Sequence, residues 1–247
     1  KKLPLLKESM LMLARQLQPN DRVGIVTYAG EAGVALRSTS VVEGRDAILG
    51  AIKGLGAGGS TNGAGGIRVA YEMAQRNYIE GGVNRVILCT DGDFNVGTTD
   101  NDELVRLIRD RAGAGTFLSV RGFGTGNIKD DRLEAIANKG NGAYYYIDTF
   151  QEARRVLGEE LGGTLVTIAK DVKLQVEFNP AKVASYRLIG YENRMLRNRD
   201  FNDDKKDAGE VGAGHTVTAL YEIVPVGVAG EVDELKYSPE KLARREN

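Results

Sequence analysis

The chain has 247 residues, 42% of them hydrophobic, and its 33 basic and 34 acidic residues give a formal net charge of −1. A chain of this size can bury a sizeable core in one large domain or two small ones without disulfides or structural metals. Because the charge is balanced and no polybasic run occurs, we expect neither nucleic acid nor an anionic membrane surface as a partner. The single cysteine, Cys89, excludes an internal disulfide, and we expect it to be a small buried hydrophobe.

The first two thirds of the chain predict alternating helices and strands. An apolar stripe over residues 3–17 has the 3- and 4-residue spacing of a helix packed on a sheet, and residues 22–28 are typical of a buried strand. A turn at 30–33 and a short strand at 34–36 predict an antiparallel edge, since a hairpin-length connection cannot carry a parallel crossover. The later expected elements are helices over 45–55, from about 66, from about 102, from about 131 and over 150–161, and strands at 85–90, 117–122 and 143–147. Together they predict a doubly wound α/β domain with a mostly parallel sheet and one antiparallel edge strand.

The pattern changes after Gly162 and Gly163. From there, apolar and polar residues alternate, which is typical of strands with one wet face. We therefore expect a small antiparallel β domain over 162–247, after an α/β domain over 1–161. The strands expected in the β domain lie at 171–178, 183–190, 216–224 and 232–237, with a polar loop at 200–214.

A candidate site lies where the strand at 85–90 ends on Asp91 and Gly92. Ligands of open α/β sheets gather outside the carboxyl ends of the strands, so Asp91 is well placed. A glycine-rich loop that contains Thr61 leads into the next helix, and we expect Thr61 and Asp91 to meet at this edge. A hydroxyl and a carboxylate are hard oxygen donors, and they form half a coordination shell for Mg²⁺ or another hard divalent cation.

The Ser-Thr-Asn loop at 60–62, the strand that ends on Asp91 and the helix between them resemble a von Willebrand factor A domain. In that family, a metal-ion-dependent adhesion site joins an Asp-x-Ser-x-Ser motif, a Thr and an Asp, and Thr61 and Asp91 match the last two. The resemblance covers about 1–161, and the tail from about Asp171 resembles that of a bacterial subfamily of secreted or lipid-anchored A-domain proteins. No Asp-x-Ser-x-Ser occurs here, because the chain opens on what looks like the helix that follows it. We therefore expect a central strand, which would lie between those at Val23 and Val86, to precede Lys1.

The resemblance implies a metal-ion-dependent protein–protein interaction module, for adhesion or assembly, in a bacterial cell-envelope protein, and not an enzyme. The implied cation is Mg²⁺, with Mn²⁺ and Ca²⁺ as alternatives, and the implied partner is a protein or peptide that supplies a carboxylate. We expect an extracytoplasmic location, with membrane association only through an anchor upstream of Lys1. The metal residues are Thr61 and Asp91, and the expected partner-binding rim is Ser60, Asn62, Asp93, Asn95, Thr125 and Asn127.

The same residues have alternative interpretations. A phosphohydrolase using Asp91 and a metal would need a lysine or arginine nearby, and none adjoins Asp91 or Thr61 in sequence. A scaffold with a vestigial metal site would leave Thr61 and Asp91 as loop hydrogen-bonding groups. The run at 54–59 fits a dinucleotide fingerprint formally, but it follows a helix instead of a strand. His215 is the only histidine and is expected to be structural, so the sequence does not indicate His-based zinc sites or Ser-His-Asp or Cys-His catalysis.

Overall fold

The computed structural model describes residues 2–28, 32–58, 62–91, 101–124, 130–159, 167–190, 195–203, 206, 208–212 and 216–228. The chain divides into two compact units, which are described separately. The first contains Lys1–Val172 and Ala208–His215, and the second contains Lys173–Asp207 and Thr216–Asn247. The expected boundary between residues 161 and 162 lies outside the described residues and stays a prediction.

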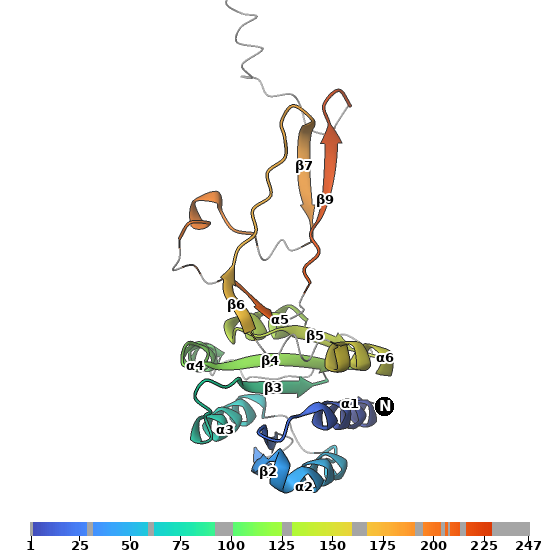
Figure 1. The fold of residues 1–247 in the computed structure, drawn as a ribbon, viewed down its shortest axis with the longest axis vertical. Coiled ribbons are helices and arrows are strands. Elements are labelled where there is room, and N and C mark those ends of the chain that lie inside the picture. Colours follow the sequence, from blue (N-terminus) through green and yellow to red (C-terminus); the bar gives the residue numbers. More distant parts are fainter. Residues whose placement is uncertain are drawn as a thin grey trace, which may run out of the picture. The chain divides into compact units, whose positions relative to one another are not determined.

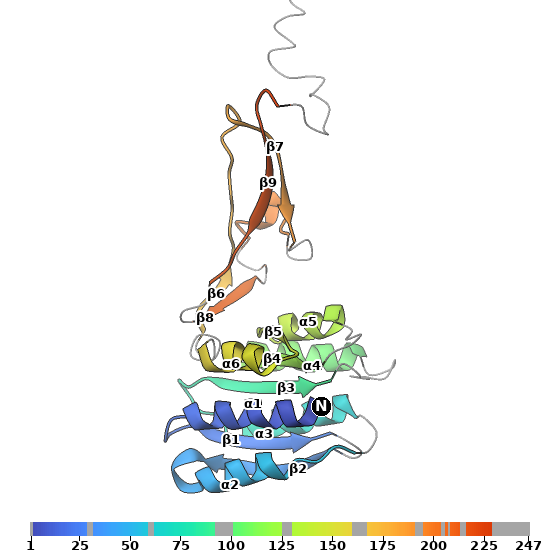
Figure 2. The ribbon, with the colours of Figure 1, turned by 90° about the vertical axis from the view of Figure 1, so that its right-hand side faces the viewer.

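The first unit alternates helices and strands as the sequence predicts (Figures 1 and 2). Its helices are α1 (Lys2–Gln16), α2 (Val41–Gly54), α3 (Gly63–Arg76), α4 (Asn101–Gly113), α5 (Asp130–Lys139), α6 (Phe150–Arg154) and the π-helical turn η1 (Arg155–Glu159). Its strands are β1 (Arg22–Thr27), β2 (Gly33–Ser40), β3 (Asn84–Thr90), β4 (Thr116–Phe123), β5 (Tyr144–Ile147), β6 (Thr167–Val172) and β8 (Gly209–Gly212).

A parallel three-stranded sheet, in the order β3-β4-β5, forms the centre of this unit. Helices α3, α4 and α5 pack on one face through residues such as Ile67, Ile108 and Leu133, which join Leu118 of β4 in one core. Helices α1 and α6 contribute to a second core with Phe123 and Ile147 on the other face. Every position of β4 is buried as a result. The doubly wound α/β prediction is confirmed.

The second sheet of this unit is the pair β1-β2, which is antiparallel and confirms the predicted edge. Helix α2 packs on it through Val41, Ile48 and Ile52. Within the described residues no ladder joins β1 to β3, so each strand has one edge without a strand partner (Figure 2). The expectation that β1 is buried on both faces is wrong, since Arg22 and Gly24 are exposed. The gap between the two sheets is where the sequence predicts the upstream strand.

The final helix of the first unit differs from the prediction in its geometry. Thr149 caps it as expected, because its hydroxyl accepts a hydrogen bond of 3.2 Å from the backbone N–H of Glu152. The Glu152 carboxylate pairs with Arg155 instead of completing a capping box. After Arg154 the helix widens into the π-helical turn η1.

The strands of the tail are divided between the two units, because β6 and β8 belong to the first unit. The second unit holds β7 (Val183–Ile189) and β9 (Leu220–Pro225), which pair antiparallel, and the short η3 helix (Asn198–Asp200). Phe178 stacks near Tyr186 and Tyr221, with ring centroids 4.7 and 5.3 Å away.

Two tail predictions are wrong. The strand expected at 171–178 is replaced by β6, which overlaps it only at Asp171 and Val172, and the left-handed φ of 53° at Asp171 lies where the register of β6 is irregular. The polar loop expected at 200–214 contains β8, which pairs with β6. Residues 232–237 lie outside the described part. None of the helices described is long and apolar enough to cross a membrane.

Candidate functional site

Strand β3 delivers Asp91 to one edge of the parallel sheet, as predicted. The strand is in register with β4 from Asn84 opposite Thr116 to Thr90 opposite Gly122, so both strands end at this edge. Val86 and Leu88 are buried in the core, whereas the side chain of Asp91 is 56% exposed. The core therefore fixes the strand, and the carboxylate projects from its end into solvent.

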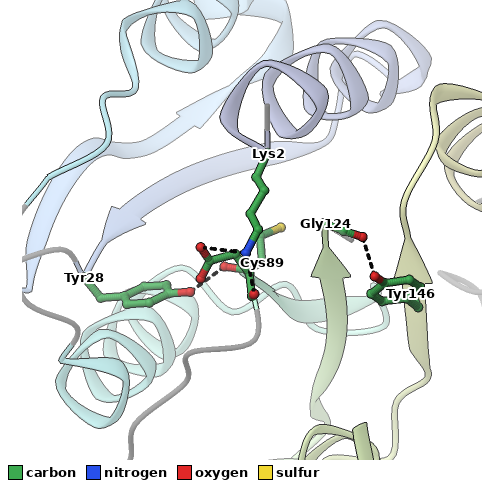
Figure 3. Close-up of polar contacts among 6 residues, drawn as sticks. Lys2, Tyr28, Cys89, Gly124 and Tyr146 are labelled. Carbon is green, nitrogen blue, oxygen red and sulfur yellow. Dashed lines mark hydrogen bonds and ion pairs between the residues drawn. The ribbon is translucent and has the colours of Figure 1, made fainter. Parts of the chain in front are cut away.

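Tyr28, which follows β1, ties the start of α3 to the end of β3. Its hydroxyl donates to the carbonyl of Cys89 at 2.5 Å (Figure 3). The carbonyl of Tyr28 accepts from the backbone N–H of Asn62 at 3.0 Å. A Cβ at Gly66 would lie 2.6 Å from the Cβ of Tyr28, so a glycine in α3 permits this approach. Burial raises the pKa of the Tyr28 phenol, which keeps the hydroxyl protonated as a donor at neutral pH.

Asn62 is the N-cap of α3, because its side-chain oxygen accepts a hydrogen bond of 3.0 Å from the backbone N–H of Gly65. Its backbone is bonded to Tyr28, and Tyr28 is bonded to Cys89, two residues before Asp91. The chain just after position 61 is thus held at the same edge of the sheet as Asp91.

Lys2, in the first turn of α1, reaches across this edge to Asp91 (Figure 3). Its ammonium group lies 3.1 Å from the backbone carbonyl oxygen of Asp91 and 3.4 Å from the carboxylate oxygen Oδ2. Both side chains are partly exposed, at 44% for Lys2 and 56% for Asp91. A pair this exposed contributes little stability, about 0–1 kcal/mol. Its importance is that the Asp91 carboxylate faces a cation.

Gly124, at the end of β4, completes the described part of the edge. Its φ is +134°, which favours glycine, and a Cβ there would lie 2.7 Å from Cε of Lys2. The Gly124 N–H donates to Ile147 at 3.1 Å, and its carbonyl accepts a hydrogen bond from the Tyr146 hydroxyl (Figure 3). A glycine at this position therefore leaves room for the Lys2 side chain.

Cys89 lies beside these groups but is not suited to bind a metal as a thiolate. Burial raises the pKa of its thiol to about 12, against the opposing influence of the Arg121 charge. The thiol is therefore protonated at neutral pH. Only the thiolate is a strong metal ligand, so oxygen donors must supply any coordination at this edge.

The described residues test the predicted site only in part. Asp91 and Asn62 lie at the same edge of the sheet, and Asn62 uses its side chain as a helix cap. Within the described ranges, no group of three or more His, Cys, Asp or Glu side chains could hold a metal ion. The other predicted positions lie outside the described residues, and they are Ser60, Thr61, Asp93, Asn95, Thr125 and Asn127.

Sequence reasoning missed Lys2, Tyr28 and Gly124. Lys2 could have been placed from the resemblance, because a helix that directly follows the expected motif must begin at this edge. Tyr28 ends a strand at the same edge, but the reach of its hydroxyl to Cys89 depends on how α3 packs. The conformation of Gly124 has no signal in the sequence beyond the glycine itself.

Comparison with protein families matches the chain in two parts. Residues 1–159 match the von Willebrand factor type A domain, and residues 163–247 match the family described as "Uncharacterized protein YfbK, C-terminal". A relative in Escherichia coli K12, "Uncharacterized protein YfbK", is 45% identical over 244 residues. The alignment covers 98% of this chain but only 42% of that relative.

Solved structures show the same fold. A von Willebrand factor type A protein from Catenulispora acidiphila has a TM-score of 0.55 and 19% identity, over 67% of this chain and 39% of that one. An aerotolerance-related membrane protein from Bacteroides fragilis has a TM-score of 0.53 and 19% identity, over 64% of this chain and 87% of that one. With the family match over residues 1–159, these findings show that the chain belongs to the von Willebrand factor type A domain family.

Proposed function

We propose that the chain is a metal-ion-dependent protein-binding module, for adhesion or assembly, of a bacterial cell-envelope protein. The observation that carries the proposal is the edge at the end of β3. There, the backbone and the hydroxyl of Tyr28 form hydrogen bonds that hold the start of α3 beside an exposed Asp91 carboxylate that faces a cation. Membership of the von Willebrand factor type A family supports a metal-dependent site at this edge.

The residues at this edge fit a hard divalent cation. Asp91 presents a solvent-accessible carboxylate, and the nearby ammonium of Lys2 shows that the position attracts positive charge. In the proposal, Thr61 contacts the metal directly and Asp91 acts through water. Bound Mg²⁺, or Mn²⁺ or Ca²⁺ in its place, would supply an electrophilic position that a carboxylate of the partner completes.

The side chains around this position would select the partner. In the proposal the rim consists of Ser60, Asn62, Asp93, Asn95, Thr125 and Asn127, with Asn62 acting through the helix start that it caps. Lys2 would neutralise Asp91 while no metal is bound and move away when the cation arrives, because two cations at one carboxylate repel each other. The partner would be a protein or peptide with an accessible Asp or Glu.

An extracytoplasmic location is part of the proposal and is supported by the sequence resemblance to secreted or lipid-anchored A-domain proteins. Fractionation of the native bacterium, with detection of the protein in cytoplasmic, periplasmic and membrane fractions, tests it directly. Recovery in the cytoplasmic fraction alone would contradict the location while leaving the binding function open.

The binding function is tested by capture from an envelope extract, using a chain extended upstream of Lys1. We expect specific proteins to be retained with Mg²⁺ and released by EDTA. The Asp91→Ala variant should retain none of them while keeping the circular dichroism spectrum of the parent. Capture that is unchanged by both EDTA and Asp91→Ala would refute the proposal.

Lys2 also favours a second candidate, a metal-dependent phosphohydrolase that uses Asp91. Such an enzyme needs a positive side chain near the carboxylate, and Lys2 lies 3.4 Å from it. A panel of phosphate esters, assayed with Mg²⁺ and Mn²⁺, separates the candidates. Turnover that is lost in both Asp91→Ala and Lys2→Gln would establish the enzyme, whereas no turnover together with EDTA-sensitive capture would support the binding module. If neither turnover nor capture is detected, the remaining candidate is a scaffold with a vestigial metal site.

A further inference from the structure

A second candidate site lies at the opposite edge of the parallel sheet, where the strands begin. A pocket of about 210 Å³ is lined by Gln75, Tyr78, Arg111, Ala114 and Thr116. Thr116 is the first residue of β4 and pairs with Asn84 at the start of β3, whereas Asp91 follows the other end of β3. The pocket is therefore separate from the proposed metal site.

Arg111 is distinctive because no described residue forms a hydrogen bond or an ion pair with its partly buried guanidinium group. It follows Leu104 and Ile108 on the inner side of α4, and its Nε atom is buried without a hydrogen-bond partner. Other partly or fully buried arginines are engaged, for example Arg68 with Glu103 at 2.9 Å and Arg45 with the carbonyl of Leu17 at 3.0 Å. In the described part of the chain, nothing comparable pairs with Arg111.

A second unpaired donor lies near this guanidinium. Tyr71 of α3 is 1% exposed, and its hydroxyl has no hydrogen-bond partner in the described part of the chain. Burial raises the pKa of this hydroxyl and the nearby Arg111 charge opposes the shift, so the two groups interact. A buried N–H or O–H without a partner costs about 1–3 kcal/mol. Tyr71 does not line the pocket, so the donor that an acceptor bound there would satisfy is the Nε of Arg111.

The walls of the pocket limit what that acceptor can be. Gly115 has a φ of +88°, and a Cβ there would lie 2.7 Å from the Tyr78 hydroxyl, so this glycine lets the Tyr78 ring lie over the turn after α4. The volume is below the roughly 300–1,000 Å³ of pockets that hold drug-sized ligands. A small ligand with one acceptor group and an apolar part would fit.

The charge of the pocket favours a single negative charge. Among the described residues that line it, Arg111 alone is charged, and α3 and α4 both end here, at Arg76 and Gly113. Helix C-termini carry partial negative charge, which disfavours a dianion such as phosphate. A carboxylate has one charge, and its two oxygens match the planar fork of an arginine.

We propose that this pocket binds the carboxylate group of a small organic acid, with Arg111 as the residue that pairs with it. Gln75 and Thr116 line the pocket as further polar groups, and Tyr78 gives the apolar part of the ligand an aromatic wall. The site requires no metal and no partner protein, so it is independent of the function proposed for the Asp91 edge.

Titration of the full chain with sodium benzoate at constant ionic strength tests the proposal. The amide chemical shifts of residues 114–116 report the binding. We expect saturable shifts in the millimolar range. The Arg111→Gln variant should bind about tenfold more weakly or worse, since a charge-assisted hydrogen bond is lost. Arg111→Lys should also bind more weakly, because it keeps the charge but loses the fork.

Arg109→Gln is the matched control, because Arg109 lies on the same helix, carries the same charge and is exposed. It should bind benzoate like the parent chain. Sodium phosphate, titrated in parallel, should bind more weakly than benzoate. The proposal is overturned if benzoate binding does not saturate, if Arg111→Gln binds as tightly as Arg109→Gln, or if phosphate binds more tightly.

Discussion

The two sheets of the first unit differ in how completely their strands are enclosed. In β3-β4-β5, the central strand has a partner on each edge and helices on both faces, and all of its positions are buried. In β1-β2, the strand β1 has one described partner, and all of its positions are exposed or only partly buried. Enclosure thus depends on pairing at both edges as well as on apolar sequence, since β1 and β4 are both rich in β-branched and apolar residues.

This difference matters for the candidate site because β3 stands at the boundary between the two sheets. One edge of β3 is paired to β4, and the other faces the gap toward β1. Asp91 at its end is therefore fixed by the enclosed sheet on one side. On the other side, Tyr28 and Lys2 form hydrogen bonds across the boundary at this edge.

The largest effect that sharpens the comparison is on stability. Leu118 of β4 is 0% exposed, so Leu118→Ala should lower the free energy of unfolding by about 2–5 kcal/mol through the cavity it leaves. Val34 of β2 is 49% exposed, and Val34→Ala should cost less than about 1 kcal/mol. Urea denaturation measures both. Equal losses would mean that the two sheets are equally enclosed.

The next effect concerns the gap itself. If the expected upstream strand pairs with β1 and β3, their facing amides gain partners that are each worth about 1–3 kcal/mol when buried. In a chain extended upstream, we expect the hydrogen-exchange rates of these amides to fall about tenfold or more. The exchange rates of the β4 amides should change little. Exchange mass spectrometry of both chains gives the result. Unchanged exchange in β1 and β3 would show that no strand enters the gap.

At Thr61 we expect a smaller effect on stability and a large effect on binding. Its hydroxyl is proposed as a metal ligand outside the core, so Thr61→Ala should change the unfolding free energy by no more than about 1 kcal/mol. That corresponds to a shift of about 2–4 °C in Tm at this chain length. Capture of the partner by the extended chain should nevertheless be lost. A Tm lowered by more than about 8 °C with capture intact would make Thr61 structural.

The smallest effect is expected at Lys2. Lys2→Gln removes a positive charge 3.4 Å from the Asp91 carboxylate, a distance at which two unit charges interact by about 1 kcal/mol in water. Because both side chains are partly exposed and salt screens them, metal affinity should rise only severalfold. Calorimetry with Mn²⁺ at low and moderate salt checks this, and the gain should shrink as salt rises. Weaker metal binding would show that Lys2 supports the site instead of competing for it.

Local patterns in the sequence predict the enclosed sheet well. The apolar run that ends on Asp91 places a carboxylate at the end of β3, and Thr149 caps α6 as its position implies. These features depend on neighbours in the chain or on burial on both faces.

Features that depend on distant partners could not be predicted in this way. The alternation at 171–178 indicates a strand, but β6 ends at Val172, one residue after the left-handed Asp171, and Leu174 is 71% exposed. Strand β8 lies in a polar segment and exists because β6 supplies its partner. Similarly, the contact of Lys2 with Asp91 joins residues 89 positions apart, and no local pattern encodes it.

The hydrogen bonds of Tyr28 have a consequence for how such a site can change in evolution. Tyr28 accepts from the backbone of Asn62 and donates to the backbone of Cys89, so neither of these two bonds uses the side chain of its partner. Substitutions at other positions of the proposed rim can alter the surface offered to a partner while these bonds persist. New binding specificities could therefore arise on this scaffold by single substitutions, without a change of fold.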